Sequence, residues 1–146
     1  IIDGGAGIAE SSLNLTLAAD QVVVVLTPDP TSLADAYATI KVLSAKGCDS
    51  FGVVVNMVES EDEAVAVEEK LSLLTQKFLD LTPTFLGRLP RNRKLSSAIR
   101  KDRSLLAEHG LGDFTNRLNH IVQNLITENE VSTSFFDRLL TTTSGD

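Results

Sequence analysis

Short apolar runs alternate with longer amphipathic stretches along most of this sequence. Continuous apolar runs at 22–26 and 51–55, rich in β-branched residues, are typical of strands buried on both faces of a parallel sheet. Residues 84–89 predict a further short strand, which Pro90 ends. The opening Ile1-Ile2 predicts the end of another such strand. Because helical patterns separate these strands, the sequence predicts an α/β fold with a parallel sheet, flanking helices and right-handed crossovers.

The ends of the predicted helices carry capping signals. Asp29 or Thr31 can cap a helix that Gly47 ends, and Ser60 with Glu63 forms the capping box of the next helix. A first helix is expected after the opening glycines and a last one near the end of the core. Apolar spacing predicts these inward-facing residues for the three later helices: Leu33, Ala36, Tyr37, Ile40 and Leu43; Val67, Leu71, Leu74 and Phe78; Phe114, Leu118, Ile121 and Leu125, with Asp113 as cap.

The net charge of −7 hides a local excess of positive charge. Seven of the thirteen Lys and Arg residues lie within 88–103, where Asp102 is the one acid. A basic stretch on an acidic chain predicts an anionic partner at that stretch. Nucleotide, DNA and the acidic helices of the chain itself all remain open as that partner.

Cysteine content and hydropathy indicate a cytoplasmic setting. Cys48 is the single cysteine, which excludes an internal disulfide and agrees with a reducing compartment. The longest apolar run, at 22–26, is far shorter than the roughly 20 residues that span a bilayer. One cysteine and two histidines are too few for a structural zinc site.

Polar residues follow the predicted strands at the ends where α/β proteins bind ligands. Asp3, Thr27-Pro28 and Asn56 come directly after three strands, and 90–92 follow the fourth. Because the carboxyl ends of parallel strands meet at one edge, these groups are expected to lie together. The glycines that end at Gly7 would let the backbone approach a phosphate closely. Both residues also have an explanation without a ligand. Asp3 can be the helix-entry residue of a tight turn between strand and helix, and Asn56 can form the turn after its strand.

Three runs of residues are shared with a known family. They are Asp3-x-x-Ala-Gly-Ile, the run from Ala18 to Val25, and Thr27-Pro28-Asp29-Pro30-Thr31-Ser32-Leu33-x-Asp35-Ala36-Tyr37. Together they resemble the second half of MinD/ParA-type P-loop ATPases, and most of all the flagellar-number regulators of that group (FlhG/FleN). The family usually has Thr, Ser or Cys where this chain has Gly4.

The resemblance implies a P-loop NTPase-like, Rossmann-type three-layer fold that binds ATP or ADP with Mg²⁺. It implies that Asp3 handles Mg²⁺ through water, that Asn56 contacts the adenine ring, and that the loop 89–92 closes over the base. The full set of nucleotide-binding residues that it implies is Asp3, Gly7, Pro28, Asn56, Pro90 and Arg91. A homodimer in the ATP-bound state and protein partners of flagellar assembly are implied as well.

The phosphate-binding motif of that family, G-x-x-x-x-G-K-[ST], does not occur in this sequence. Residues 1–128 are therefore interpreted as the C-terminal part of a larger ATPase domain, which alone is not expected to hydrolyse ATP. Its sheet should be incomplete because the P-loop strand is missing. The opening segment must then leave the sheet, pair with a new neighbour, or borrow a strand from another molecule.

The function predicted from the resemblance is an ATP-dependent dimerisation switch that controls flagellar number or cell-pole placement. Two alternatives stay open. One is a partition protein that binds DNA non-specifically through 88–103. The other is a non-catalytic α/β interaction domain whose basic stretch pairs with its own acidic helices.

Residues 129–146 are predicted to be a flexible tail with one apolar cluster. Phe135, Phe136, Leu139 and Leu140 would share one side of a helix. Relatives in the resembled family end in a short amphipathic helix that docks on the membrane, which implies peripheral contact with its inner face. The alternative is that the cluster packs back on the domain.

Overall fold

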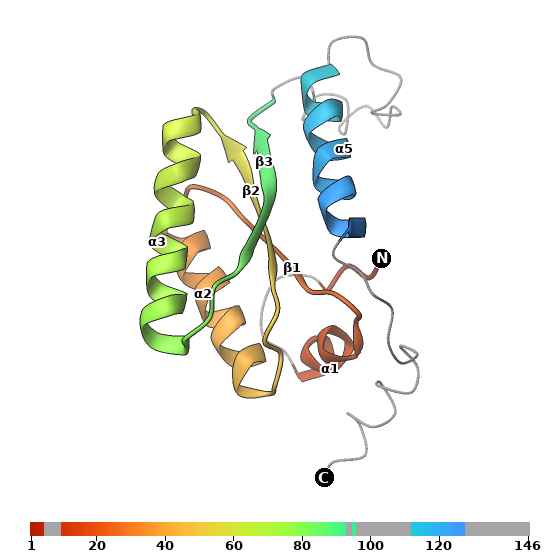
Figure 1. Ribbon diagram of the computed structural model, residues 1–146, viewed down its shortest axis with the longest axis vertical. Coiled ribbons are helices and arrows are strands. Elements are labelled where there is room, and N and C mark those ends of the chain that lie inside the picture. The colour runs from red at the N-terminus through yellow and green to blue at the C-terminus, as the bar shows by residue number, and fades with distance from the viewer. Residues whose placement is uncertain (5–9, 93–94, 96–111, 128–146) are drawn as a thin grey trace.

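The computed structural model describes residues 1–4, 10–92, 95 and 112–127. Three strands form one parallel sheet in the order β1-β2-β3: β1 (Val23–Leu26), β2 (Gly52–Val58) and β3 (Thr84–Pro90). The helices are α1 (Glu10–Ala18), α2 (Pro30–Ala45), α3 (Glu61–Leu79) and α5 (Gly112–Thr127). Figure 1 shows α2 and α3 on one side of the sheet and α5 on the other. The predicted α/β fold with a parallel sheet and flanking helices is confirmed.

Two apolar clusters hold the layers together. The larger one lies between the sheet and the pair α2 and α3, and it includes Ile40, Leu71 and the strand residues Val53 and Val55. The smaller one lies on the opposite face, where Ile121 of α5 packs on residues of β2 and β3, namely Val54, Leu86 and Leu89. Alternate residues of β2 therefore point to different cores, as in a strand covered on both faces.

Local capping chemistry sets the helix ends as predicted. The Asp29 carboxylate accepts from the Thr31 N–H at 2.8 Å, and Pro30 starts α2 with its φ already fixed. The Ser60 hydroxyl accepts from the Glu63 N–H at 3.1 Å, and the Glu63 carboxylate accepts from the Glu59 N–H at 2.7 Å. In the usual capping box, Glu63 would accept from the N–H of the cap, Ser60. Here it accepts from the N–H of Glu59, the residue before the cap, which is a variant of that motif.

Three helix predictions are wrong in detail. Phe78 is 60% exposed, and Thr75 takes the buried place near the end of α3. The Thr75 hydroxyl can be buried because it donates to the Leu71 carbonyl at 3.0 Å. Leu118 is 37% exposed and does not belong to the buried core. Asp113 lies within the first turn of α5 and pairs with Arg117, so it is not the cap.

The opening segment does not join the sheet. Residues 1–4 form no strand, and the side chains of Ile1 and Ile2 are exposed. The predicted strand end at Ile1-Ile2 is therefore wrong, while departure from the sheet is one of the three outcomes expected for an incomplete sheet. Within the described residues, β1 pairs with β2 and with no other strand.

Two sets of predicted residues lie outside the described part of the chain. They are the basic residues from Arg93 to Arg103 and the tail with its apolar cluster. In the described helices, none is both long enough and apolar enough to cross a membrane.

Candidate functional site at the carboxyl edge of the sheet

The carboxyl ends of the three parallel strands meet at one edge of the sheet. Leu26 of β1 pairs with Val55 of β2, so Thr27 and Asn56 follow side by side. Val58 pairs with Pro90, and the Val58 carbonyl accepts from the Arg91 N–H at 2.9 Å. The structure thus brings together Pro28, Asn56, Pro90 and Arg91 of the six predicted nucleotide-binding residues, as the strand order requires.

A β-bulge shapes the middle of this edge. Val55 pairs with Arg88 and Val58 with Pro90, so Asn56 and Met57 together oppose the single residue Leu89. Met57 has φ 60°, a left-handed conformation that is uncommon for a residue with a side chain. Bulges redirect side chains and are frequent beside binding sites. The bulge therefore marks the end of β2 as the most distinctive part of this edge.

Asn56 is fixed by the bulge. Its Oδ1 accepts from the Met57 N–H at 2.8 Å, and the residue is half-buried. The Nδ2 group has no hydrogen-bond partner in the described part of the chain. Among the described residues, one lone pair of Oδ1 and both Nδ2 protons thus remain without a partner, and these are the groups with which an amide binds a ligand.

The turn after β1 is held by short hydrogen bonds. The Thr27 N–H donates to the Ser32 hydroxyl at 2.9 Å, which ties the turn to the first turn of α2. The Thr31 hydroxyl and N–H both donate to Asp29 and hold the pKa of that carboxyl below its usual range. Half-buried Pro28 lies between these two anchors, so its position is well fixed.

Asp3 does not reach this edge. A Cβ added at the neighbouring Gly4 would lie 3.7 Å from the Thr16 hydroxyl of α1, near the amino end of β1. In Figure 1 the N-terminus lies well away from the carboxyl ends of β2 and β3. The structure therefore does not bring Asp3 together with Asn56 and Pro90, and Gly7 lies outside the described residues.

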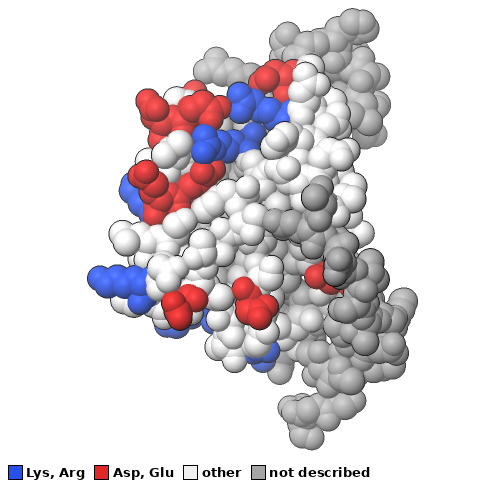
Figure 2. Space-filling model, viewed as in Figure 1, with Lys and Arg blue, Asp and Glu red and all other residues white. Residues whose placement is uncertain are grey.

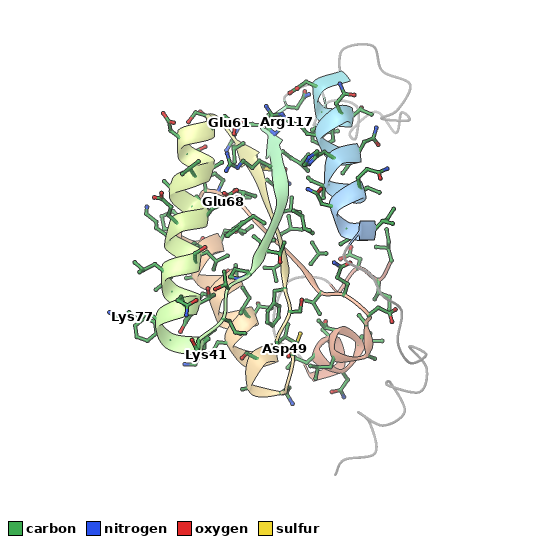
Figure 3. The ribbon with its side chains drawn as sticks, in the orientation of Figure 1. Lys41, Asp49, Glu61, Glu68, Lys77 and Arg117 are labelled. Carbon is green, nitrogen blue, oxygen red and sulfur yellow. The ribbon has the colours of Figure 1, made fainter. Side chains whose placement is uncertain are left out.

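A network of ion pairs joins three elements beside the site. Arg88 of β3 binds Glu68 of α3 through Nε and Nη2, at 2.7 and 2.8 Å, and donates from Nη1 to Glu61 at 2.7 Å. Arg117 of α5 donates to the other oxygen of Glu61 at 2.9 Å and to Asp113 at 3.2 Å. Figure 3 shows Glu61 and Arg117 facing each other between α3 and α5, and Figure 2 shows the basic and acidic groups interleaved there.

The network sets the charges of its members. Hydrogen bonds from Arg88 and then Arg117 lower the pKa of Glu61. The paired carboxylates raise the pKa of Arg88, with Glu68 contributing most, and Glu61 raises that of Arg117. Glu61, Arg88 and Arg117 therefore stay charged near neutral pH, and Arg88 is held by the carboxylates of α3.

Arg91 also has an acidic neighbour. Its Nε lies 3.1 Å from Glu59 Oε1, and the two side chains are 58% and 68% exposed. An exposed pair of this kind contributes little to stability and can be exchanged for another anion. Both described basic residues of the stretch 88–103 are thus paired within the chain.

Sequence reasoning missed the features that define this site. The left-handed Met57 has no local signal such as Gly or Asn at its own position. The sequence left open that the basic stretch pairs with the acidic helices of the chain, but it did not indicate which acids bind Arg88, because Glu61 and Glu68 lie 27 and 20 residues away. Glu61, Glu68 and Arg88 form the centre of the network, and only the fold brings them together.

Comparison with known proteins decides the family. The chain is 35% identical to the antiactivator FleN of Pseudomonas aeruginosa over 72% of its length, and 31% identical to the flagellum site-determining protein YlxH of Helicobacter pylori over 96%. The chain belongs to the MinD/ParA family. It is also 28% identical to the septum site-determining protein MinD of Synechocystis over 76% of its length. No family model matches the chain.

Solved structures of this family share the fold. The MinD cell division protein of Aquifex aeolicus superposes with a TM-score of 0.58 over 80% of this chain, and MinD in the MinC:MinD complex with 0.54. Sequence identity is 18% in both, so the likeness concerns the fold, which is that of P-loop NTPases. The chain spans 38% of FleN, 51% of YlxH and 48% of MinD, about half the length of its MinD/ParA relatives.

Proposed function

We propose that this chain supplies the base-binding side of an ATP site in a MinD/ParA-type switch that controls flagellar number or cell-pole placement. The observation that carries the proposal is the bulge at the end of β2, which holds half-buried Asn56 between the ends of β1 and β3. The flagellar role is supported by the names of two relatives, an antiactivator FleN and a flagellum site-determining YlxH.

The chemistry of the edge suits an adenine ring. An asparagine amide donates through Nδ2 and accepts through Oδ1 in one plane, which matches the ring nitrogen and exocyclic amine of adenine. The Met57 N–H occupies one lone pair of Oδ1 and leaves the other. The apolar rings of Pro28 and Pro90, both half-buried, flank this position and would pack beside the base.

The described residues at this edge suit the adenine base, but they do not form a site for Mg²⁺. Asp3 lies away from the carboxyl edge, and the described residues contain no group of three or more His, Cys, Asp or Glu that could hold a metal. The contacts proposed for the base therefore do not involve Asp3. Its role in handling Mg²⁺ remains a prediction of the family resemblance.

The wider switch follows from the family. Nucleotide binding would favour a homodimer, and the dimer would present a surface to protein partners in flagellar assembly. Because positioning of the phosphates depends on a P-loop, and no such motif occurs in this sequence, the chain alone is proposed not to hydrolyse ATP.

Nuclear magnetic resonance with adenosine tests the base site directly. Adenosine at millimolar concentration should shift the amide signals of Asn56, Met57 and Arg91, and guanosine should shift them less. Asn56→Ala should abolish the adenosine shifts, whereas the control Asn119→Ala, on the exposed side of α5, should keep them. Equal shifts with Asn56→Ala, or shifts only elsewhere, would refute the base site.

Activity and flagellation test the rest of the proposal. The purified chain should release no phosphate from ATP above the rate without protein; turnover that Asp3→Ala abolishes would contradict this. In cells, Asn56→Ala should change the number or position of flagella, counted by electron microscopy, while Asn119→Ala should not. Normal flagellation with Asn56→Ala at normal protein level would refute the role in placement.

DNA binding is the less favoured alternative. Arg88 and Arg91 are paired with Glu59, Glu61 and Glu68, so the described start of the basic stretch is compensated within the chain. A mobility-shift titration decides between the two. Tight DNA binding at low salt that falls steeply with added salt would favour the partition-type function instead.

A further inference from the structure

The outer edge of β3 lies at the bottom of a groove, at the side of the sheet opposite β1. The groove has a volume of about 490 Å³ and is lined by β3, by Glu68 of α3 and by residues of α5. Since α3 and α5 cover opposite faces of the sheet, each forms one wall, and the strand edge lies between them (Figure 1). The groove is therefore separate from the edge of β1 and from the site around Asn56.

The backbone of β3 directs hydrogen-bonding groups into this groove. Among the described residues, β3 pairs with β2 on its inner side and with no strand on its outer side. The Thr84 N–H donates to the Phe51 carbonyl at 2.9 Å, so Thr84 faces β2. Successive residues of a paired strand alternate in direction, so the N–H and C=O of Phe85 face outward, where Phe85 lines the groove. Within the described part of the chain, these two groups have no strand to bind.

The α5 wall of the groove carries a row of polar, uncharged side chains. Asn116, His120 and Asn124 line the groove and recur every four residues, so they form a ladder along one flank of the helix. The ladder is about 12 Å long, which matches roughly four residues of an extended strand. It therefore accompanies β3 along the groove.

Asn124 shows that this ladder lies within reach of a strand backbone. Its Nδ2 group donates to the Leu86 carbonyl at 2.8 Å. The same group lies 3.1 Å from His120 Nδ1, so Nδ1 accepts, and the ring proton of neutral His120 is on Nε2. The Asn116 amide is exposed and has no hydrogen-bond partner among the described residues. The ladder thus offers further donors and acceptors to a neighbouring chain.

The charged groups around the groove are already paired. Glu68 binds Arg88, and Arg117 donates to Glu61 at 2.9 Å, which joins α5 to α3 beside β3. Figure 2 shows the basic and acidic groups gathered at one end of this face, with uncharged surface next to them. The groove therefore offers hydrogen bonds to a ligand, but little net charge.

We propose that this groove binds an extended segment of a partner protein as an added strand beside β3. One edge of the segment pairs with the outward N–H and C=O of Phe85. Its other backbone groups lie beside the amide and imidazole groups of the ladder. Addition of a strand to an exposed sheet edge is a common mode of peptide recognition. This inference does not depend on the proposed nucleotide site.

The shape and chemistry of the groove favour this occupant over others. In a second copy of the chain, the edge of β3 lies between α3 and α5 in the same way, so two such edges cannot approach to the distance of about 4.8 Å between paired strands. A single extended segment has no flanking helices and meets no such barrier. Phosphate and nucleic acid need unpaired basic side chains, whereas Arg88 and Arg117 are paired here.

Hydrogen exchange of the purified chain tests whether the edge is open. The Phe85 amide should exchange at least about tenfold faster than the Thr84 amide, which is bonded to the Phe51 carbonyl. Equal protection at every protein concentration would mean that another segment of this chain covers the edge. Protection of Phe85 that rises with concentration would mean a second copy. Either result would overturn the proposal.

Peptide selection tests the binding itself. A phage-displayed library of random peptides of about twelve residues, selected on the immobilised chain without nucleotide, should yield peptides that slow exchange of the Phe85 amide. Asn116→Ala should weaken their binding by about tenfold. The control Asn119→Ala, on the exposed side of α5 and outside the groove, should leave it unchanged.

Backbone methylation separates strand addition from binding through side chains alone. Two synthetic copies of a selected peptide, methylated on one or the other set of alternate backbone nitrogens, keep all their side chains. The copy that loses the N–H groups facing β3 should bind about tenfold more weakly than the other copy. Equal binding of the two copies, binding that Asn116→Ala leaves unchanged, or a library that yields no peptide would overturn the proposal.

Discussion

Ile121 of α5 packs on Gly87 of β3 so closely that a Cβ on residue 87 would lie 2.6 Å from Ile121 Cγ1. Gly87 has φ 156°, and it lies at a register shift where β3 has one residue more than β2. The carbonyl of Leu86, in the same shift, accepts from Asn124 Nδ2 of α5 at 2.8 Å. The missing side chain at residue 87 therefore sets how near α5 approaches the sheet.

Gly87→Ala should lower the free energy of unfolding by about 1–3 kcal/mol, because the new methyl group overpacks the contact with Ile121. Urea denaturation measures the change. The matched control is Gly112→Ala, where a Cβ meets nothing within 4 Å, and it should be nearly neutral. Adding Ile121→Ala to Gly87→Ala should cost less than the sum of the two single changes. Equal losses for both glycines would show that the contact does not limit α5.

Arg88→Met should destabilise the fold by about 1–3 kcal/mol, because it leaves the carboxylate of Glu68 without its partner. The Glu68 side chain is only 14% exposed, so water replaces the lost bonds poorly. Arg88→Lys should recover only part of the loss, since an ammonium cannot bind both oxygens of Glu68 in one plane. The matched control Arg91→Met removes an exposed pair and should change stability by less than about 0.5 kcal/mol. A loss as large as that of Arg88→Met would contradict the ranking.

The pairing of Glu61 makes stability depend on pH. Arg88 and Arg117 lower the pKa of Glu61 in the folded chain, so its contribution is fully present above its unfolded pKa, about 4.3. It is lost as pH falls through the lower folded pKa. Unfolding measured from pH 6 to pH 3 should show this decline, and Glu61→Gln should make the curve flatter in that window. A curve for Glu61→Gln that parallels the unmodified chain would refute the role of this carboxylate.

Met57→Gly should stabilise the fold by about 1 kcal/mol. The left-handed φ of 60° costs a residue with a Cβ roughly that much, and Met57 is 46% exposed, so little burial is lost. Met57→Ala keeps the strain and should give no gain, which makes it the control. Thermal unfolding compares the three proteins. If glycine and alanine behave alike, the strain at the bulge is absent.

The strands, the helix caps and the order of elements were predictable because each depends on residues close together in the sequence. Val22 to Leu26 marks a strand by composition alone, although its predicted burial on both faces is wrong, because Val23 and Val25 are exposed. Asp29 or Ser60 caps the helix that follows directly. The candidate site was predicted in part for the same reason. Pro28, Asn56, Pro90 and Arg91 each lie within two residues of the carboxyl end of a strand, and a parallel sheet must bring strand ends to one edge.

The exposed surfaces escaped prediction because exposure depends on what else is packed nearby. Phe78 and Leu118 fall at apolar positions of their helices, yet they are 60% and 37% exposed. Val25 lies in the same apolar run as buried Val24, yet it points to the other face of the sheet and is 60% exposed. Apolar spacing shows which side of an element faces inward, but not how far the covering layer extends.

The sequence by itself determined a parallel α/β fold, because alternating strand and helix patterns leave few ways to bury the strands. The type of fold, that of MinD/ParA ATPases, came from the resemblance of three runs of residues within 3–37. Tertiary structure alone decided the bulge at Asn56 and Met57, the pairing of Arg88 with Glu61 and Glu68, and the close contact of Gly87 with Ile121. These features join residues up to 34 positions apart, counted from Gly87 to Ile121. No local pattern encodes such contacts, since they exist only once β2, β3, α3 and α5 have packed together.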